Sequence, residues 1–184
     1  VDFLNNISQG LVDINADGLC GYYNGKVFIN HQRSTIDNLD DLPLPDYESL
    51  PMEKYFEYNV PFSPFPRGKR VMQIYTSRGC PIGCTFCAST NFNKVFRSRS
   101  PENVISEIKY YIDRYSIDEI QFADDNLTLN KKRSIELFSL LEKCNIQWCT
   151  PNGIMINTLT QEVIDKMIRS GLYQITMSID SGSG

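Results

Sequence analysis

The stretch "SRGCPIGCTFCAST", residues 77–90, places Cys80, Cys84 and Cys87 within eight positions, with glycine and proline beside them. Gly79 and Gly83 let the backbone turn where other residues are strained, and proline favours tight turns. The spacing Cys-x3-Cys-x2-Cys therefore predicts a loop that turns around a compact object held by three thiols. No histidine stands nearby as a fourth ligand, so the question is what three thiols would hold.

Several interpretations of this loop are open. A structural zinc site normally has four tetrahedral ligands, and neither the single histidine, His31, nor Cys144 or Cys149 stands close in the sequence. Cysteine thiolates also hold iron–sulfur clusters, and three of them would leave one iron without a protein ligand. A third interpretation is a group of buried or redox-sensitive cysteines, with which the flanking glycines and proline agree poorly.

The composition limits the classes of function. The net charge is −4 and the pI is near 5.0, so no strongly basic surface indicates a nucleic acid partner. No run approaches the roughly 20 apolar residues of a membrane span, and the N-terminus lacks the features of a signal peptide. Clustered thiols in such a chain indicate a cytoplasmic metal or redox protein, and Cys20, Cys144 and Cys149 are interpreted as small hydrophobic residues.

Residues 1–70 differ from the remainder of the chain. They hold six of the nine prolines, all between Pro43 and Pro66, which prevents long regular elements. Before these prolines, residues 18–30 predict a hairpin with its turn at Asn24-Gly25. We expect residues 1–70 to be a connector with the remnant of an upstream domain, and residues 71–184 to form the main domain.

From Val71 onward, strands and helices alternate. The pattern predicts strands over residues 71–77, 118–124, 146–151 and 173–180, and helices over residues 100–115, 130–144 and 160–171. Such a β-α-β-α-β-α-β order indicates an α/β fold with a parallel sheet and right-handed crossovers. The pattern is compatible with an open doubly wound sheet and with about half of a barrel.

Candidate ligand groups follow each predicted strand. The three cysteines follow the first strand, and the ranges 124–126, 150–153 and 178–183 follow the next three. In parallel β/α folds, ligands bind beyond the carboxyl ends of the strands. The sequence therefore predicts one shared site at this edge of the sheet.

The segment "YTSRGCPIGCTFC" resembles the cluster-binding loop of the radical S-adenosylmethionine (radical SAM) superfamily, with the aromatic Phe86 before the last cysteine. The similarity extends over about residues 35–184 and is strongest to the branch that carries an N-terminal cobalamin-binding domain. It implies a partial β/α barrel of the radical SAM type, of which about half is present here. It also implies that the chain is part of a longer enzyme, with residues 1–70 as the connector from an upstream, cobalamin-binding-like domain.

The resemblance implies a site in which Cys80, Cys84 and Cys87 hold a 4Fe–4S cluster whose open iron binds S-adenosylmethionine. It implies that Asp124 or Asp125 contacts the amino group of this cofactor, that Asp180 bonds the ribose, and that Ser178 and Phe86 are further contacts. The alternative interpretation gives these residues no role in binding. In it, the aspartates form an Asx turn that caps the next helix, Ser178 is a polar residue at an exposed strand end, and Phe86 is a packing residue.

The implied function is reductive cleavage of S-adenosylmethionine to a 5′-deoxyadenosyl radical that abstracts hydrogen from a small-molecule substrate. A cobalamin-dependent methyltransferase or a related oxidoreductase is expected, with cobalamin bound by a domain outside this chain. The alternatives are a noncatalytic iron–sulfur or zinc module and a simple α/β binding domain. The expected partners are an external electron donor of the flavodoxin or ferredoxin type and a second copy that pairs with the open edge strand, but no nucleic acid or membrane.

Overall fold

The structure is a computed structural model that describes residues 4, 7–10, 14–92 and 94–177. It divides into two compact units, Val1–Asp37 and Asn38–Gly184. In the first unit, β1 (Cys20–Tyr23) pairs antiparallel with β2 (Lys26–Ile29). Asn24 and Gly25 between them have positive φ angles of 49° and 76°, as a two-residue hairpin turn requires. The predicted hairpin is therefore confirmed.

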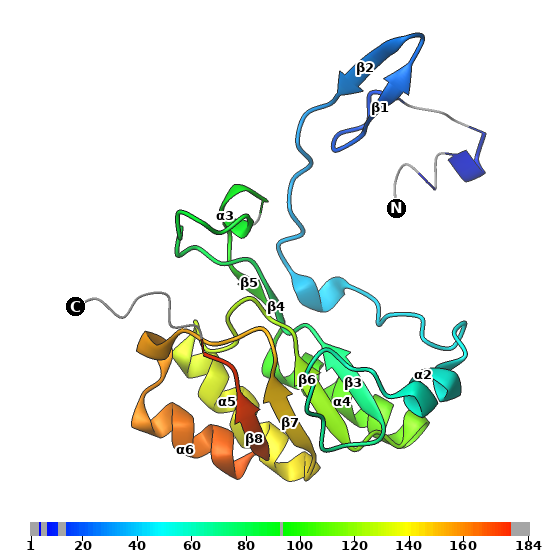
Figure 1. The fold of residues 1–184 in the computed structure, drawn as a ribbon. Helices are drawn as coiled ribbons and strands as arrows, with labels where there is room; N and C mark the ends of the chain where they lie inside the picture. The colour runs from blue at the N-terminus through cyan, green and yellow to red at the C-terminus, as the bar shows by residue number, and fades with distance from the viewer. Residues whose placement is uncertain (1–3, 5–6, 11–13, 93, 178–184) are drawn as a thin grey trace. The chain divides into compact units, whose positions relative to one another are not determined.

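The second unit contains a four-stranded parallel sheet. Its strands are β3 (Val71–Ile74), β6 (Glu119–Phe122), β7 (Gln147–Thr150) and β8 (Leu172–Ile175), and they lie side by side in that order (Figure 1). Each crossover connection thus places the next strand beside the one before it, always on the same side. A doubly wound sheet reverses direction partway, whereas a barrel does not. The strand order therefore selects the barrel type between the two folds that the sequence left open.

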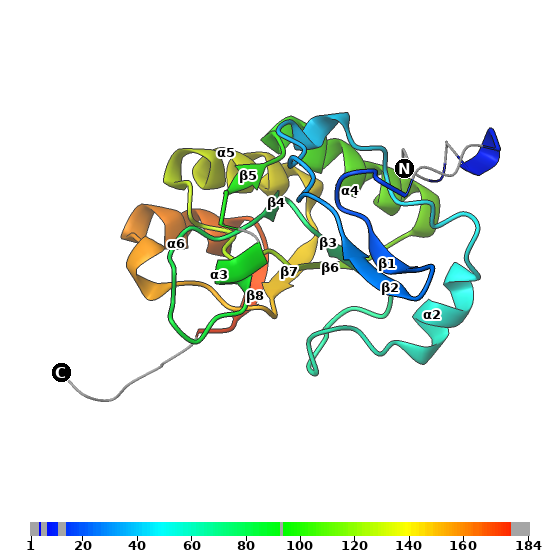
Figure 2. The ribbon, with the colours of Figure 1, turned by 90° about the horizontal axis from the view of Figure 1, so that it is seen from above.

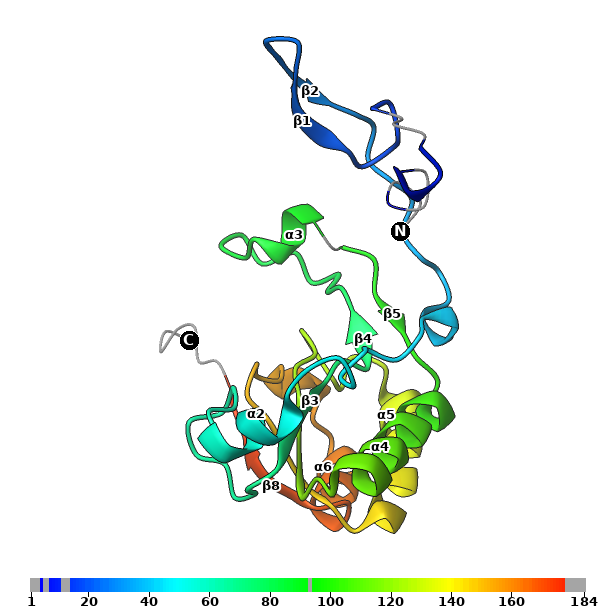
Figure 3. The ribbon, with the colours of Figure 1, turned by 90° about the vertical axis from the view of Figure 1, so that its right-hand side faces the viewer.

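Three helices connect these strands: α4 (Pro101–Tyr115), α5 (Lys131–Leu141) and α6 (Gln161–Arg169). Figures 2 and 3 show them on one side of the sheet, as right-handed crossovers in one direction require. Each begins at a side-chain cap, since Ser100, Asn130 and Thr160 accept hydrogen bonds from backbone N–H groups in the first turn. The short 3₁₀ helix η2 (Glu142–Cys144) extends α5, and η3 (Ile156–Thr158) precedes α6.

The main core lies between the helices and the sheet. Trp148 of β7 stacks on Phe138 of α5 with ring centroids 5.2 Å apart, and meets Phe122 of β6 edge-on at the same centroid distance. Further buried residues come from the three helices and from β3 and β6: Met72, Ile74, Val104, Ile108, Tyr111, Ile120, Leu137, Leu141, Val163 and Met167. The three helices predicted from the sequence are therefore present, and each buries apolar side chains in the core.

The connector contains two short helical elements that the sequence pattern did not predict. A 3₁₀ helix, η1 (Leu39–Asp41), and a seven-residue helix, α2 (Met52–Tyr58), lie in it. The α2 helix fits between Pro51 and Pro61, and it ends at Asn59 in the left-handed conformation with φ 42°. Phe56 on this helix is buried in the main core, so the second half of the connector is an integral part of the second unit.

Residues 63–70 close the end of the sheet at which the strands begin, which we call the floor. Glu119 is fully buried there and accepts hydrogen bonds from the N–H groups of Arg67 and Gly68, both at 2.7 Å. It also accepts bonds from the side chains of Gln121 and Tyr173. The floor is thus a polar network in which the connector supplies two of the four donors to Glu119, and β6 and β8 supply the other two.

Within the described residues, no helix is long and apolar enough to cross a membrane.

Candidate active site

The carboxyl ends of β3, β6 and β7 meet at the opposite edge of the sheet, which we call the rim. Residues 76–78 follow β3, and the predicted ranges 124–126 and 150–153 lie at the carboxyl ends of β6 and β7. Ser178 and Asp180, predicted after the fourth strand, lie outside the described residues. The structure thus brings two of the predicted groups, 124–126 and 150–153, to one edge, and the cysteines of the first predicted group lie on a loop that extends from this edge.

The cysteines lie on a long excursion from the rim. Two short strands, β4 (Ser77–Arg78) and β5 (Arg97–Ser98), pair antiparallel and form its neck. Between them, residues 79–96 form the cysteine loop, which includes the short helix α3 (Ser89–Phe92). Figures 1 and 3 show this loop standing out from the end of the sheet.

Glycine conformation shapes the turns of this loop. Gly79 and Gly83 have φ angles of 91° and 75°, which favour glycine, and the Cys87 N–H donates to the Cys84 carbonyl at 3.1 Å. All three cysteines are half-buried, and none of them forms a disulfide. Phe86 is 75 % exposed, so packing does not account for its side chain.

The three thiols are not gathered at one point. Among the described residues, no three side chains of histidine, cysteine, aspartate or glutamate lie close enough to hold a metal ion as they stand. The donor set nevertheless suits an iron–sulfur cluster, because three cysteine side chains stand on one short loop and none of them is in a disulfide. Ligation by all three requires the loop to contract.

The structure distinguishes the two adjacent aspartates. Asp124 is 2 % exposed, and its carboxylate accepts hydrogen bonds from the N–H and hydroxyl of Thr76 and from the hydroxyl of Ser77. Burial raises the pKa of Asp124, while these hydrogen bonds and nearby Arg133 lower it. Asp125 is exposed and lines a cleft with Tyr75, Ser77 and Arg78. Asp124 therefore organises the rim, and Asp125 faces the space above it.

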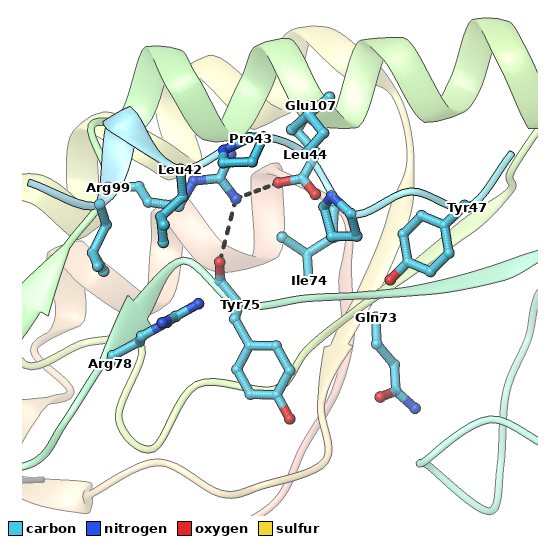
Figure 4. A pocket seen from close by; sticks show the side chains of 12 residues that line it. Leu42, Pro43, Leu44, Tyr47, Gln73, Ile74, Tyr75, Arg78, Arg99 and Glu107 are labelled. Atoms are coloured by element: carbon cyan, nitrogen blue, oxygen red, sulfur yellow. Dashed lines mark hydrogen bonds and ion pairs between the residues drawn. The ribbon is translucent and has the colours of Figure 1, made fainter. Parts of the chain in front are cut away.

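A second cleft lies between the connector and the end of β3 (Figure 4). Arg78 and Tyr75 line it as well as the first cleft. In Figure 4, Arg99 reaches across to Glu107 of α4 and to the Tyr75 carbonyl, which it contacts at 3.3 Å. Arg99 is therefore engaged in a structural ion pair.

Sequence reasoning missed Arg133, which is 7 % exposed on α5. Its Nε donates to the Arg99 carbonyl at 2.7 Å, and its Nη2 donates to the Thr76 carbonyl at 3.0 Å. A signal for this role exists in the sequence: Arg133, Leu137 and Leu141 lie at i, i+4 and i+8, so the arginine continues a buried apolar stripe.

Three buried polar atoms near the rim have no hydrogen-bond partner within the part of the chain that the structure describes. They are Nη1 of Arg133, Nδ2 of Asn126 and Oγ1 of Thr150. Buried polar atoms are normally satisfied, so unsatisfied ones at a rim indicate a place for a ligand or water.

Comparison with known proteins agrees with this architecture. The model of the Radical SAM superfamily matches residues 74–184, which begin in β3 and include the cysteine loop. The chain therefore belongs to the radical SAM superfamily. The family and the fold class expected from the sequence are confirmed, and with them the general class of enzyme.

Two curated relatives are methyltransferases by name. The chain is 41 % identical over 150 residues to cytidylyl-2-hydroxyethylphosphonate methyltransferase of Streptomyces wedmorensis, covering 81 % of this chain and 28 % of that protein. It is 38 % identical over 169 residues to the uncharacterized methyltransferase PH0819 of Pyrococcus horikoshii, covering 90 % of this chain and 34 % of that protein. The chain thus spans about a third or less of these relatives.

Solved structures of the radical SAM methyltransferase TsrM from Kitasatospora setae share the fold. The structure with tryptophan and a SAM analogue matches with a TM-score of 0.70 at 13 % identity, over 93 % of this chain and 33 % of that chain. The structure with cobalamin and a [4Fe-4S] cluster matches with a TM-score of 0.50 at 14 % identity, over 55 % and 21 %. At such identities, the likeness establishes the fold alone.

Proposed function

We propose that this chain provides the cluster-binding part of a radical SAM methyltransferase. The observation that carries the proposal is the position of the cysteine loop, which leaves the sheet at the carboxyl end of the first strand of a barrel-type sheet. In this proposal, Cys80, Cys84 and Cys87 hold a 4Fe–4S cluster. The cluster and S-adenosylmethionine together supply a 5′-deoxyadenosyl radical when bound.

The roles of the rim residues follow from their exposure. Asp125, which faces the first cleft, accepts hydrogen bonds from the cofactor's ammonium group, while Asp124 holds the end of β3 in place. Phe86 lies exposed on the cysteine loop beside the proposed ligands and contacts the adenine in this proposal. Ser178 and Asp180 remain predicted contacts at the end of the fourth strand.

Methyl transfer is proposed because both curated relatives above are methyltransferases by name. We propose cobalamin as a further cofactor, held outside this chain, since one TsrM structure contains it and the single histidine here is exposed in the first unit. The comparisons give no support to a noncatalytic iron–sulfur or zinc module. The alternative to a methyltransferase in this proposal is a related oxidoreductase.

The proposed partners are an external electron donor of the flavodoxin or ferredoxin type and a small-molecule substrate, without nucleic acid or membrane, in the cytoplasm.

Self-association through β8 stays a prediction. An apolar groove lies along this strand and α6, lined by Leu159, Ile164, Met167, Ile168 and Leu172. Size-exclusion chromatography tests this self-association, since a protein that stays monomeric at all concentrations would contradict pairing of two copies through β8.

Anaerobic reconstitution tests the proposed function. We expect about four irons and four sulfides per chain in the wild type and loss of nearly all of both in Cys84→Ala. Cys149→Ala is the matched control, because this cysteine is buried in β7, remote in sequence from the loop. The reduced, loaded protein should release 5′-deoxyadenosine from S-adenosylmethionine. One tightly held zinc, or an unchanged cluster in Cys84→Ala, would contradict the proposal.

A further inference from the structure

The neck of the cysteine loop, residues 76–78 and 97–99, has few bonds of its own. The antiparallel ladder between β4 and β5 contains two residue pairs, Ser77 with Ser98 and Arg78 with Arg97. One further backbone bond joins the Arg99 N–H to the Thr76 carbonyl at 2.9 Å. Two-stranded ribbons of this size are at most marginally stable alone. Other groups must therefore hold the two sides of the neck together.

Arg133 lies where it can hold the two sides of the neck together. Its Nε and Nη2 donate to the carbonyls of Arg99 and Thr76, which belong to the two sides of the neck. The planar guanidinium presents its donors in a fixed fork, which suits two acceptors at a set separation. A single side chain of α5 thus bridges the residue that precedes the cysteine-loop excursion and the residue that follows it.

Buried charges surround this bridge and balance it. Asp124 accepts hydrogen bonds from three donors of Thr76 and Ser77 on the first side of the neck. Arg99, on the second side, is bonded to Glu107 and to the Tyr75 carbonyl. Two cations and two carboxylates therefore enclose the neck, and the charges of Asp124 and Arg133 attract each other.

We propose that Arg133 is a positioning residue for the iron–sulfur cluster, because it fixes the separation of the two chain segments from which the cysteine loop departs. This inference rests on the proposed function. The three thiols must come together when they bind a cluster, and a fixed neck confines that rearrangement to residues 79–96. Arg133 contacts no cysteine, so it acts through the backbone of the neck.

Hydrogen exchange in the cluster-free protein tests the bridge without the cofactor. In Arg133→Met, we expect the amides of residues 75–79 and 96–100 to exchange at least about ten-fold faster, while those of 119–122 in β6 stay protected. Arg133→Lys keeps the charge but lacks the fork, so an intermediate rate is expected. Arg114→Met on α4 is the matched control, since Arg114 is 53 % exposed and pairs only with exposed Glu48 among the described ion pairs.

Iron retention in the reconstituted full chain tests the consequence. We expect Arg133→Met to lose iron to a chelator at least about three-fold faster than wild type and Arg114→Met, with unchanged circular dichroism. Unchanged exchange at the neck, or unchanged iron loss despite faster exchange, overturns the inference. A wild type that takes up no cluster instead overturns the proposed function, and the positioning role with it. Global loss of protection, including β6, would show that Arg133 serves the whole fold and would also overturn the inference.

Discussion

The two ends of the parallel sheet are both rich in polar side chains, but they use them differently. At the floor, fully buried Glu119 accepts hydrogen bonds from two backbone N–H groups and two side chains. At the rim, Asp125 is exposed, and buried atoms of Asn126 and Thr150 have no partner among the described residues. Polar groups at the floor hold the connector in place, whereas Asp125, Asn126 and Thr150 at the rim leave polar side-chain atoms without a partner among the described residues.

The largest expected effect comes from Glu119. Glu119→Ala leaves four donors of the floor without their acceptor, and because each buried donor left unsatisfied costs about 1–3 kcal/mol, the free energy of unfolding should fall by about 3 kcal/mol or more. Glu119→Gln keeps the shape and one acceptor, so a smaller loss is expected. Urea denaturation measures both, and a loss below about 1 kcal/mol in Glu119→Ala would contradict the role given to the floor.

A second test at the floor concerns Gly171, which precedes β8. Its φ is +101°, and a Cβ there would lie 2.3 Å from the carbonyl oxygen of Ile146. Gly171→Ala should therefore destabilise the protein by about 2 kcal/mol or more, because backbone strain adds to the clash. Gly83→Ala is the control at the rim: its φ is +75°, but no atom lies within 4 Å of an added Cβ. Equal losses in thermal denaturation would argue against the close packing at the floor.

The rim should show the reverse behaviour. Asp125→Asn removes an exposed charge and should change the free energy of unfolding by less than about 0.5 kcal/mol. It should weaken binding of S-adenosylmethionine to the reconstituted protein roughly ten-fold, since a charge-assisted hydrogen bond to the ammonium is lost. Asp113→Asn, an exposed aspartate on α4, is the control for charge alone. Isothermal titration calorimetry measures the affinity of both variants for S-adenosylmethionine. Equal affinities would contradict the proposed contact between Asp125 and the cofactor.

The smallest expected effect is a pH dependence at Asp124. Because burial raises the pKa of its carboxyl, the folded protein holds this proton more tightly than the unfolded chain. Its contribution to stability is therefore greatest below the unfolded pKa of about 3.9 and declines as the pH rises to the folded pKa. The stability of the wild type relative to Asp124→Asn should fall from pH 4 upward in urea denaturation. A rise over this range would mean that the hydrogen bonds outweigh burial.

The sequence predicted local structure better than spatial order. Apolar periodicity located the four strands of the parallel sheet and the helices α4, α5 and α6, because each of them buries an apolar face. It did not locate the short elements β4, α3 and β5, which have too few residues to show a period. Strand order depends on contacts between elements, so only the structure selected the barrel type. The helix α2 was missed because seven residues between prolines carry too little periodic signal.

The candidate site was predicted in part for similar reasons. The cysteine spacing and the groups after three strands were visible as short motifs. The different exposure of Asp124 and Asp125 was not, since adjacent residues at the end of a strand point in different directions. Arg133 was missed because a charged residue within a helix is usually on the solvated face, and its carbonyl partners are 34 and 57 positions away.

One measurement tests the central claim most directly, namely that the three thiols of the cysteine loop leave one iron open to S-adenosylmethionine. Electron–nuclear double resonance on the reduced, reconstituted protein would use cofactor labelled with ¹⁵N in its amino group. We predict a hyperfine coupling from that nitrogen to the cluster, present in Cys149→Ala and absent when the cluster is lost in Cys84→Ala. A 4Fe–4S signal that shows no coupling to the labelled nitrogen at saturating cofactor would contradict the account.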